Sequence, residues 1–192
     1  MNLPRRIVVH ALAAFVAATV LFLACPHEAH ATDFYAEGAV SGGASTWEQD
    51  PNVQGSLHLG FEFIDIVSVD VLGRIGYGAV DERMLMLLGI GTKVALPFDV
   101  VIPHLRVMAI HAHETPVDAM HHDTFGHIMG VGDGIRHRFG IEGALGLSVV
   151  FAKYKKASFL AQAEGYVDGF PDDRGPQVYG GAGLGLGVQV GL

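Results

Sequence analysis

Residues 178–192 read Val-Tyr-Gly-Gly-Ala-Gly-Leu-Gly-Leu-Gly-Val-Gln-Val-Gly-Leu. The even-numbered positions are apolar or small, and the odd-numbered positions after Tyr179 are glycine except for Gln189. Because successive side chains of a β-strand point to opposite faces, this period of two predicts a strand with one apolar face and one face of tiny or polar residues. Such a division is typical of a membrane β-barrel, in which the apolar face meets lipid and the other face lines a crowded interior.

The same alternation recurs upstream of this segment. Further candidate strands are residues 34–44, 57–63, 67–77, 84–96, 101–109, 126–138, 141–151 and 159–167. The face opposite the apolar one carries small residues, charges of both signs and histidines, namely Glu37, His58, Glu62, Asp70, Arg74, Lys93, His104, Arg106, Glu142 and Glu164. Since an interior tolerates charges when they are paired, we expect these residues to form a salt-bridged plug, with a proton or ion path as the functional alternative.

The composition fits a membrane barrel better than a soluble domain. Hydrophobic residues make up 50% of the chain, charged residues 17%, and the mean hydropathy is +0.36, with 26 glycines. After residue 30, no uninterrupted apolar run approaches the ~18 to 20 residues that a membrane-spanning helix needs. A soluble lipocalin-like periplasmic binding barrel also alternates, but its water-facing side would carry many more lysines and glutamates, so it stays the alternative. The 12 Lys+Arg against 20 Asp+Glu, a net charge of −8, argue against a nucleic-acid partner.

The N-terminus has the parts of a secretory signal peptide. Two arginines near the start precede an apolar stretch over residues 11–25 in which Thr19 is the one polar residue, and an Ala-His-Ala triplet ending at Ala31 has small residues where a signal peptidase reads them. The sequence therefore predicts a signal peptide over residues 1–31 and a β-barrel domain over residues 32–192. The alternative is lipidation of Cys25, because the four residues that end there loosely resemble a lipoprotein cleavage box.

The terminal strand from Tyr179 onward and the stretch Gly-Val-Gly-Asp-Gly-Ile-Arg-His-Arg-Phe at residues 130–139 resemble strand motifs of the small outer-membrane β-barrel family, the type represented by the OmpA transmembrane domain. The resemblance covers the mature chain and implies an all-β, antiparallel up-and-down transmembrane barrel of eight strands, with ten as the alternative, in the cell outer membrane. It also implies contact with outer-membrane lipid and lipopolysaccharide, insertion by the barrel assembly machinery and a monomeric state. That machinery reads a terminal Phe in most of the family, where this chain has Leu192.

Nine candidate segments can be drawn, but a bacterial barrel with both termini in the periplasm needs an even number of strands. As a strand, residues 126–138 would turn Asp133 toward lipid near mid-depth, which is energetically costly. We therefore interpret residues 112–138 as one long extracellular excursion. The alternative keeps residues 126–138 as a strand and places residues 159–167 in the last outer loop. On the favoured interpretation, the periplasmic turns lie near 65, 97–99 and 153–156, and the outer loops near 46–52, 80–83, 112–138 and 169–176.

Six of the eight histidines of the mature chain fall within residues 111–137, at the start of this excursion and inside it. They are His111, His113, His121, His122, His127 and His137, interspersed with Glu114, Asp118, Asp123 and Asp133. In an extended segment His111 and His113 point to the same side, and residues 121–123 offer a second group that can converge with them across the loop. Neutral imidazole and carboxylate ligands suit Zn²⁺, Ni²⁺ or Cu²⁺. We therefore predict a metal site, with Zn or Ni as the cofactor, drawn from His111, His113, Glu114, His121, His122, Asp123 and His127.

Other interpretations of these residues stay open. The histidines and aspartates of a polar loop can cap turns or contact lipopolysaccharide, and clustered histidines that charge below about pH 6.5 would sense pH. The basic triplet at residues 136–138 suits a lipid phosphate. A membrane-embedded hydrolase or acyltransferase acting on lipopolysaccharide is the alternative function, but no nucleophile motif marks Ser41, Ser45, Ser148 or Ser158. The sequence favours a structural or surface-recognition barrel over an enzyme and assigns no catalytic residue.

Overall fold

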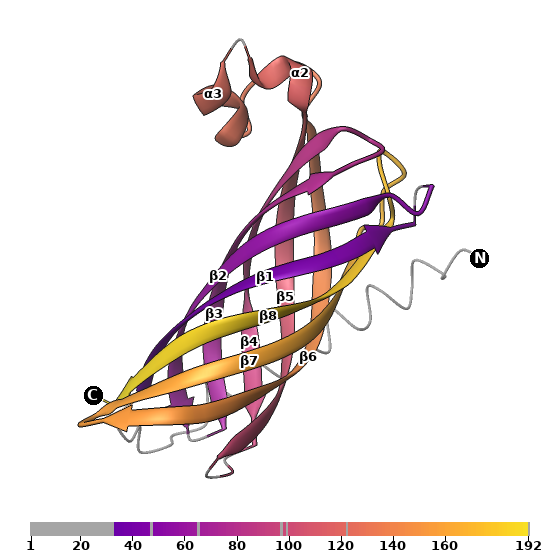
Figure 1. Ribbon diagram of the computed structural model, residues 1–192. Coiled ribbons are helices and arrows are strands. Elements are labelled where there is room, and N and C mark those ends of the chain that lie inside the picture. The colour runs from indigo at the N-terminus through magenta and orange to yellow at the C-terminus, as the bar shows by residue number, and fades with distance from the viewer. Residues whose placement is uncertain are drawn as a thin grey trace, which may run out of the picture. The chain divides into compact units, whose positions relative to one another are not determined.

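The computed structural model describes residues 33–46, 48–64, 66–96, 98, 100–121 and 123–191. The predicted signal peptide with Cys25, the predicted ligand His122 and the terminal Leu192 lie outside the described residues. Within the described residues, eight antiparallel strands form a closed barrel (Figure 1). The predicted all-β barrel of eight strands is therefore confirmed, and the alternative of ten strands is wrong.

The strands follow one another around the barrel in chain order. They are β1 (Asp33–Ser45), β2 (Pro51–Ile64), β3 (Val67–Gly78), β4 (Arg83–Ala95), β5 (Val101–Pro116), β6 (Arg136–Tyr154), β7 (Ala157–Gly169) and β8 (Val178–Gly191). Each strand pairs with the next, and β8 pairs with β1 over its whole length, so the sheet has no free edge. Among the described residues, no helix is long and apolar enough to cross a membrane.

The two longest connections lie at the same end of the barrel. At one end the connections are residues 65–66, 96–100 and 155–156, of 2, 5 and 2 residues, and at the other they are residues 46–50, 79–82, 117–135 and 170–177, of 5, 4, 19 and 8 residues. Outer-membrane barrels have short periplasmic turns and long extracellular loops, so the end with the longer connections is the outer end. The predicted alternation of turns and loops is confirmed.

The longest outer connection holds two short helices, α2 (Val117–Met120) and α3 (Thr124–Ile128), and projects beyond the wall (Figure 1). The interpretation of residues 126–138 as part of a loop is confirmed for residues 126–135. Three glycines in this stretch have positive φ angles, including 77° at Gly130 and 75° at Gly134, and these break an extended chain. The alternative that moved residues 159–167 into a loop is wrong, because they lie within β7.

The excursion is shorter than predicted. We expected it to begin at residue 112, but the ladder between β5 and β6 continues outward as far as the pair Glu114 and Arg136. These two side chains also make an ion pair at 3.3 Å, which favours continued pairing at this height. As a result, His111 and His113 are part of the wall and not of the loop.

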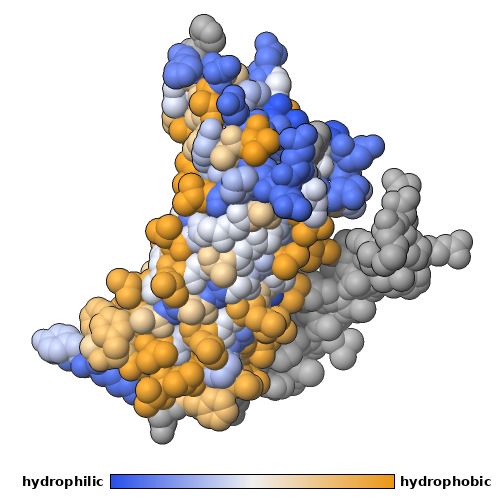
Figure 2. Space-filling model, turned by 45° about the vertical axis from the view of Figure 1, so that its right-hand side comes forward, coloured by the Kyte–Doolittle hydropathy of each residue, from blue (hydrophilic) through white to orange (hydrophobic). Residues whose placement is uncertain are grey.

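The two faces of each strand divide as the alternation predicts. On β8, Leu184 and Leu186 face outward with 72% and 65% of their surfaces exposed, whereas the intervening glycines face a crowded interior. A Cβ atom at Gly183 would lie 2.7 Å from the carbonyl oxygen of Val40, so no larger side chain fits there without movement of the backbone. Hydrophobic side chains cover much of the outer wall, and hydrophilic ones gather at the end that carries α2 and α3 (Figure 2).

This distribution is the reverse of that in a soluble barrel. The apolar residues are exposed on the outside, and charged residues fill the inside. Bulky aromatic side chains ring the periplasmic end of the exterior, as at lipid interfaces, and they include Phe61, Phe63, Phe151, Tyr154 and Phe159. The alternative of a soluble lipocalin-like barrel is therefore wrong for this chain.

Paired charges occupy the interior. Arg106 is fully buried and forms ion pairs with three carboxylates, those of Glu37, Asp70 and Glu164. Nearer the outer end, Arg74 lies 2.8 Å from Glu142 and 3.0 Å from Asp168. The predicted salt-bridged plug is thus present.

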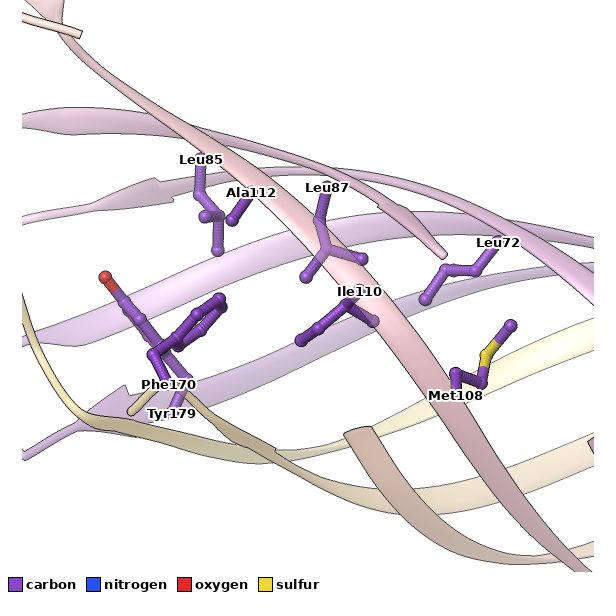
Figure 3. Close-up of a cluster of buried hydrophobic side chains, with 8 residues drawn as sticks. All are labelled: Leu72, Leu85, Leu87, Met108, Ile110, Ala112, Phe170 and Tyr179. Carbon is purple, nitrogen blue, oxygen red and sulfur yellow. The ribbon is translucent and has the colours of Figure 1, made fainter. Parts of the chain in front are cut away.

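A second, apolar layer lies inside the outer half of the barrel, and the sequence pattern does not predict it. Its members are Leu72, Leu85, Leu87, Met108, Ile110, Ala112, Phe170 and Tyr179 (Figure 3). The reason is visible in β4, where Met84 to Leu88 are all apolar, so a period of two carries no information about which residues point inward. The barrel interior therefore alternates between charged and apolar layers along its axis.

Candidate metal centre

The candidate site lies on the outer face of the hairpin formed by β5 and β6, where these strands reach the outer end. Even-numbered residues of β5 are buried in the interior, so the odd-numbered His111 and His113 point outward. The register places His113 opposite His137 on β6 and His111 opposite Phe139. Directly opposed side chains of antiparallel strands stand close together, and three histidines therefore meet on one patch of the exterior.

The three imidazoles are close enough to share one ion. Their rings are 4.6 Å apart for His111 and His113, 4.7 Å for His113 and His137, and 5.8 Å for His111 and His137, measured between centroids. One ring nitrogen of each lies within 4.8 Å of the others, and the Nε2 atoms of His111 and His113 are 2.7 Å apart. Two nitrogens bound to one tetrahedral zinc at about 2.0–2.1 Å stand about 3.4 Å apart, so small side-chain rotations would suffice.

The charge state of this cluster suits a cation. His111 and His113 are both half-buried. Both residues lie beyond the apolar outward row of β5 that runs from Val101 to Ala109, a length that matches one membrane crossing, and so they stand at the outer border of the lipid. Neutral imidazole is the form that binds metal, and it is the predominant form of histidine at neutral pH.

The outer loop packs against the cluster. A Cβ atom at Gly130 would lie 2.4 Å from the His113 ring, so the backbone of the loop touches this imidazole directly. The positive φ of 77° at Gly130 is a conformation that glycine adopts without strain, which explains glycine here. The loop segment that follows α3 thus lies directly beside the histidines.

The structure brings two of the predicted metal ligands together and turns a third away from them. His111 and His113 come together, but Glu114 is the next residue and therefore points into the barrel. There it is 1% exposed, accepts a hydrogen bond from Arg138 at 2.7 Å and another from the Tyr179 hydroxyl at 3.0 Å. Its carboxylate is engaged in these interior hydrogen bonds and points away from the histidines.

The predicted ligands on the loop also have other partners. Asp123 caps α3, because its side chain accepts a hydrogen bond from the backbone N–H of Gly126 at 2.9 Å. His127 is buried, and its Nδ1 lies 2.7 Å from the carbonyl oxygen of Asp123. His121 is exposed, and none of these three belongs to the group of candidate ligands found among the described residues.

The residue that the predicted ligand set omitted is His137. In the sequence, His137 belongs to the histidine-rich region and to the basic triplet, in which Arg136 and Arg138 suggest a phosphate contact. The structure shows that Arg138 points inward to Glu114 instead, with the fully buried side chain of a wall residue. The signal that would have found His137 is the register of the hairpin, which the sequence pattern alone does not specify.

Comparisons with known proteins agree with the fold. No family model matches the chain, and the search of curated proteins returns no match. Neisserial surface protein A has a TM-score of 0.56 with 16% identity, over 84% of this chain and 97% of that one. The N-terminal β-barrel domain of Pseudomonas aeruginosa OprF scores 0.47 with 15% identity over 82% and 97%, and the outer membrane protein OprG of the same organism scores 0.47 with 11% identity over 84% and 96%.

At these sequence identities a comparison is informative about the fold alone, and the similarity to Neisserial surface protein A supports the barrel fold. A closed barrel leaves no backbone group unpaired in lipid, and its apolar exterior requires a hydrocarbon environment. The chain is accordingly an eight-stranded β-barrel of the small outer-membrane type, located in the cell outer membrane.

Proposed function

We propose that this barrel binds a divalent transition-metal ion, Zn²⁺ or Ni²⁺, at its outer rim through His111, His113 and His137. The observation that carries the proposal is the meeting of these three imidazoles within 4.8 Å on one outward patch. On this proposal, the barrel is a rigid scaffold in the outer membrane that presents a metal ion to the cell exterior.

The chemistry of the ligand set supports a borderline metal. Three neutral nitrogen ligands suit Zn, Ni or Cu, whereas Mg²⁺ and Ca²⁺ prefer oxygen ligands. His111 and His113 stand on one strand and His137 on its hydrogen-bonded neighbour, so the ladder preorganises the site before any ion arrives. Three protein ligands leave a tetrahedral ion with one open position, and the ion would therefore accept a further ligand from outside the chain.

Calorimetric titration tests the proposal. The barrel is refolded in detergent micelles without a polyhistidine tag, and Zn²⁺ or Ni²⁺ is titrated into it. We expect one ion per barrel, and we expect each of the single variants His111→Ala, His113→Ala and His137→Ala to weaken binding about tenfold or more, which is about 1.4 kcal/mol.

His121→Ala is the matched control, because it removes an exposed histidine from the same outer region without touching the cluster. It should bind the metal as the parent does. Retention of heat-modifiable gel migration shows that each variant is folded. If His121→Ala weakens binding as much as the wall variants do, or if the parent shows no site-like binding, the proposed centre is disproved.

A further inference from the structure

An apolar groove on the outside of the barrel leads to the histidines. It has a volume of about 940 Å³, and its lining includes Gly38, Leu57, Gly73, Leu88, His111 and His113. This volume is within the range of about 300–1,000 Å³ that is usual for small-molecule sites. The groove lies on the lipid-facing surface of the barrel wall, and the candidate metal centre lies at one end of it.

Glycines on neighbouring strands create the groove. Gly38, Gly55 and Gly73 point outward from β1, β2 and β3, and larger apolar residues flank the last two on the outward face, namely Val53 and Leu57 on β2 and Val71 and Ile75 on β3. A Cβ atom at Gly55 or Gly73 would meet no other atom within 4 Å, so these positions are open to the surroundings. The groove is therefore a depression between larger apolar side chains, and not a consequence of close strand packing.

The groove climbs toward the outer end. The strand register joins Gly38 to Leu57, Leu57 to Gly73, Gly73 to Leu88 and Leu88 to His111 in one outward row. Gly38 lies in the periplasmic half of β1, whereas His111 lies in the outer half of β5. Because strands of a barrel are tilted, a row across them rises, and this one runs from hydrocarbon depth to the lipid border.

The outer loop completes the upper end. Ile128 and Met129, at the end of α3, line the same groove as His111 and His113. The groove therefore has apolar walls along its length and a nitrogen cluster where it opens to the exterior. An occupant that matches both ends has a hydrocarbon tail and a polar head.

We propose that the groove and the metal centre together bind one lipid with a phosphate headgroup. The acyl chain lies in the groove, and a phosphate oxygen is the ligand at the position that His111, His113 and His137 leave open. This inference rests on the proposed metal function. Three neutral imidazoles leave the charge of a divalent ion uncompensated, and the neighbouring carboxylate of Glu114 is directed inward and paired, so an anionic headgroup supplies the missing charge.

Native mass spectrometry of the full-length barrel in zwitterionic detergent tests the inference. Phosphatidic acid is the phosphate-bearing probe, and diacylglycerol of the same chains, which has no phosphate, is the comparison lipid. With Zn²⁺ present, we expect one retained phosphatidic acid per barrel, and at least about tenfold less retention without Zn²⁺ or with diacylglycerol.

Two variants separate the groove from the metal. Gly73→Leu fills the groove and should lower zinc-dependent retention of phosphatidic acid about tenfold while zinc affinity stays unchanged. Gly143→Leu is the matched control, because Gly143 also faces outward with no atom within 4 Å of a Cβ but lies on β6 outside the groove lining. It should retain lipid and zinc as the parent does.

The outcomes distinguish the two proposals. Zinc binding with equal lipid retention in the parent and in Gly73→Leu would overturn the lipid inference and leave the metal function intact. Absence of zinc binding in the parent would overturn both. Equal retention of phosphatidic acid and diacylglycerol would also overturn the inference, since it would show a groove that holds chains without reading the headgroup.

Discussion

Replacement of Arg106 by alanine is expected to be the most damaging single change to the barrel. The guanidinium is fully buried and contacts Glu37, Asp70 and Glu164, of which Asp70 lies at 2.8 Å. After the change, Lys93 still bonds Glu37 at 2.6 Å. Asp70 and Glu164 keep histidine partners, His58 at 3.5 Å and His104 at 2.9 Å, which are weaker because a histidine is charged only when protonated.

The magnitude follows from the cost of leaving buried charges unpaired. Removing one partner of a buried ion pair costs about 3–5 kcal/mol, and Arg106 serves three carboxylates at once, so we expect Arg106→Ala to lose at least that amount. Arg174→Ala is the control, because Arg174 is 57% exposed and its ion pair with Asp172 at 3.0 Å is worth about 0–1 kcal/mol. In the double variant Arg106→Ala/Glu164→Gln, one unpaired charge is gone, and part of the loss should be recovered.

Urea unfolding of the refolded barrel in lipid vesicles, followed by Trp fluorescence and by heat-modifiable gel migration, measures these differences. With a denaturant slope of about 1–3 kcal/mol per M, the midpoint of Arg106→Ala should fall by about 1 M or more. A loss below about 1 kcal/mol, or a double variant no more stable than the single one, would refute the view that this charge network holds the interior together.

Two further predictions concern the faces of the wall. Leu184→Arg should destabilise the barrel by about 2–4 kcal/mol, because it places a charge in the hydrocarbon. Phe125→Arg in α3 is the control, because Phe125 is 74% exposed and Leu184 is 72% exposed, and it should change stability by less than about 0.5 kcal/mol. Equal effects in urea unfolding would contradict the assignment of Leu184 to the lipid-facing surface. Gly183→Val should lower the free energy of unfolding by about 1–3 kcal/mol, because its Cβ would be 2.7 Å from Ser41. Gly55→Val has open space around it and should fold with the same yield as the parent. The reverse order would show that the inward and outward faces are wrongly assigned.

Much of the wall could be predicted because the alternation is a local property. Leu57 to Phe63 and the residues from Val178 onward alternate clearly, and the structure places both segments as predicted. Alternation has no predictive value where both faces of a strand are apolar. In β4 both faces are apolar between Met84 and Leu88, so the apolar interior layer had no signature.

The candidate site could be predicted in part. Spacing by two places His111 and His113 on one face of any extended segment, and the structure brings them together. Sequence proximity wrongly favoured Glu114, which alternation sends inward, and Asp123, whose side chain caps a helix. Both errors arose from treating residues 112–138 as a loop, where no alternation would apply.

The sequence by itself determined that the chain is a barrel and which side of most strands meets lipid, because strand geometry makes every second side chain point the same way whatever surrounds it. Only the tertiary structure decided which residues from distant segments meet. Register and closure of the sheet depend on the whole set of pairings, and they place His137 opposite His113 and Arg106 among carboxylates from β1, β3 and β7. A shift by one residue would have sent each of these side chains to the other face of the wall.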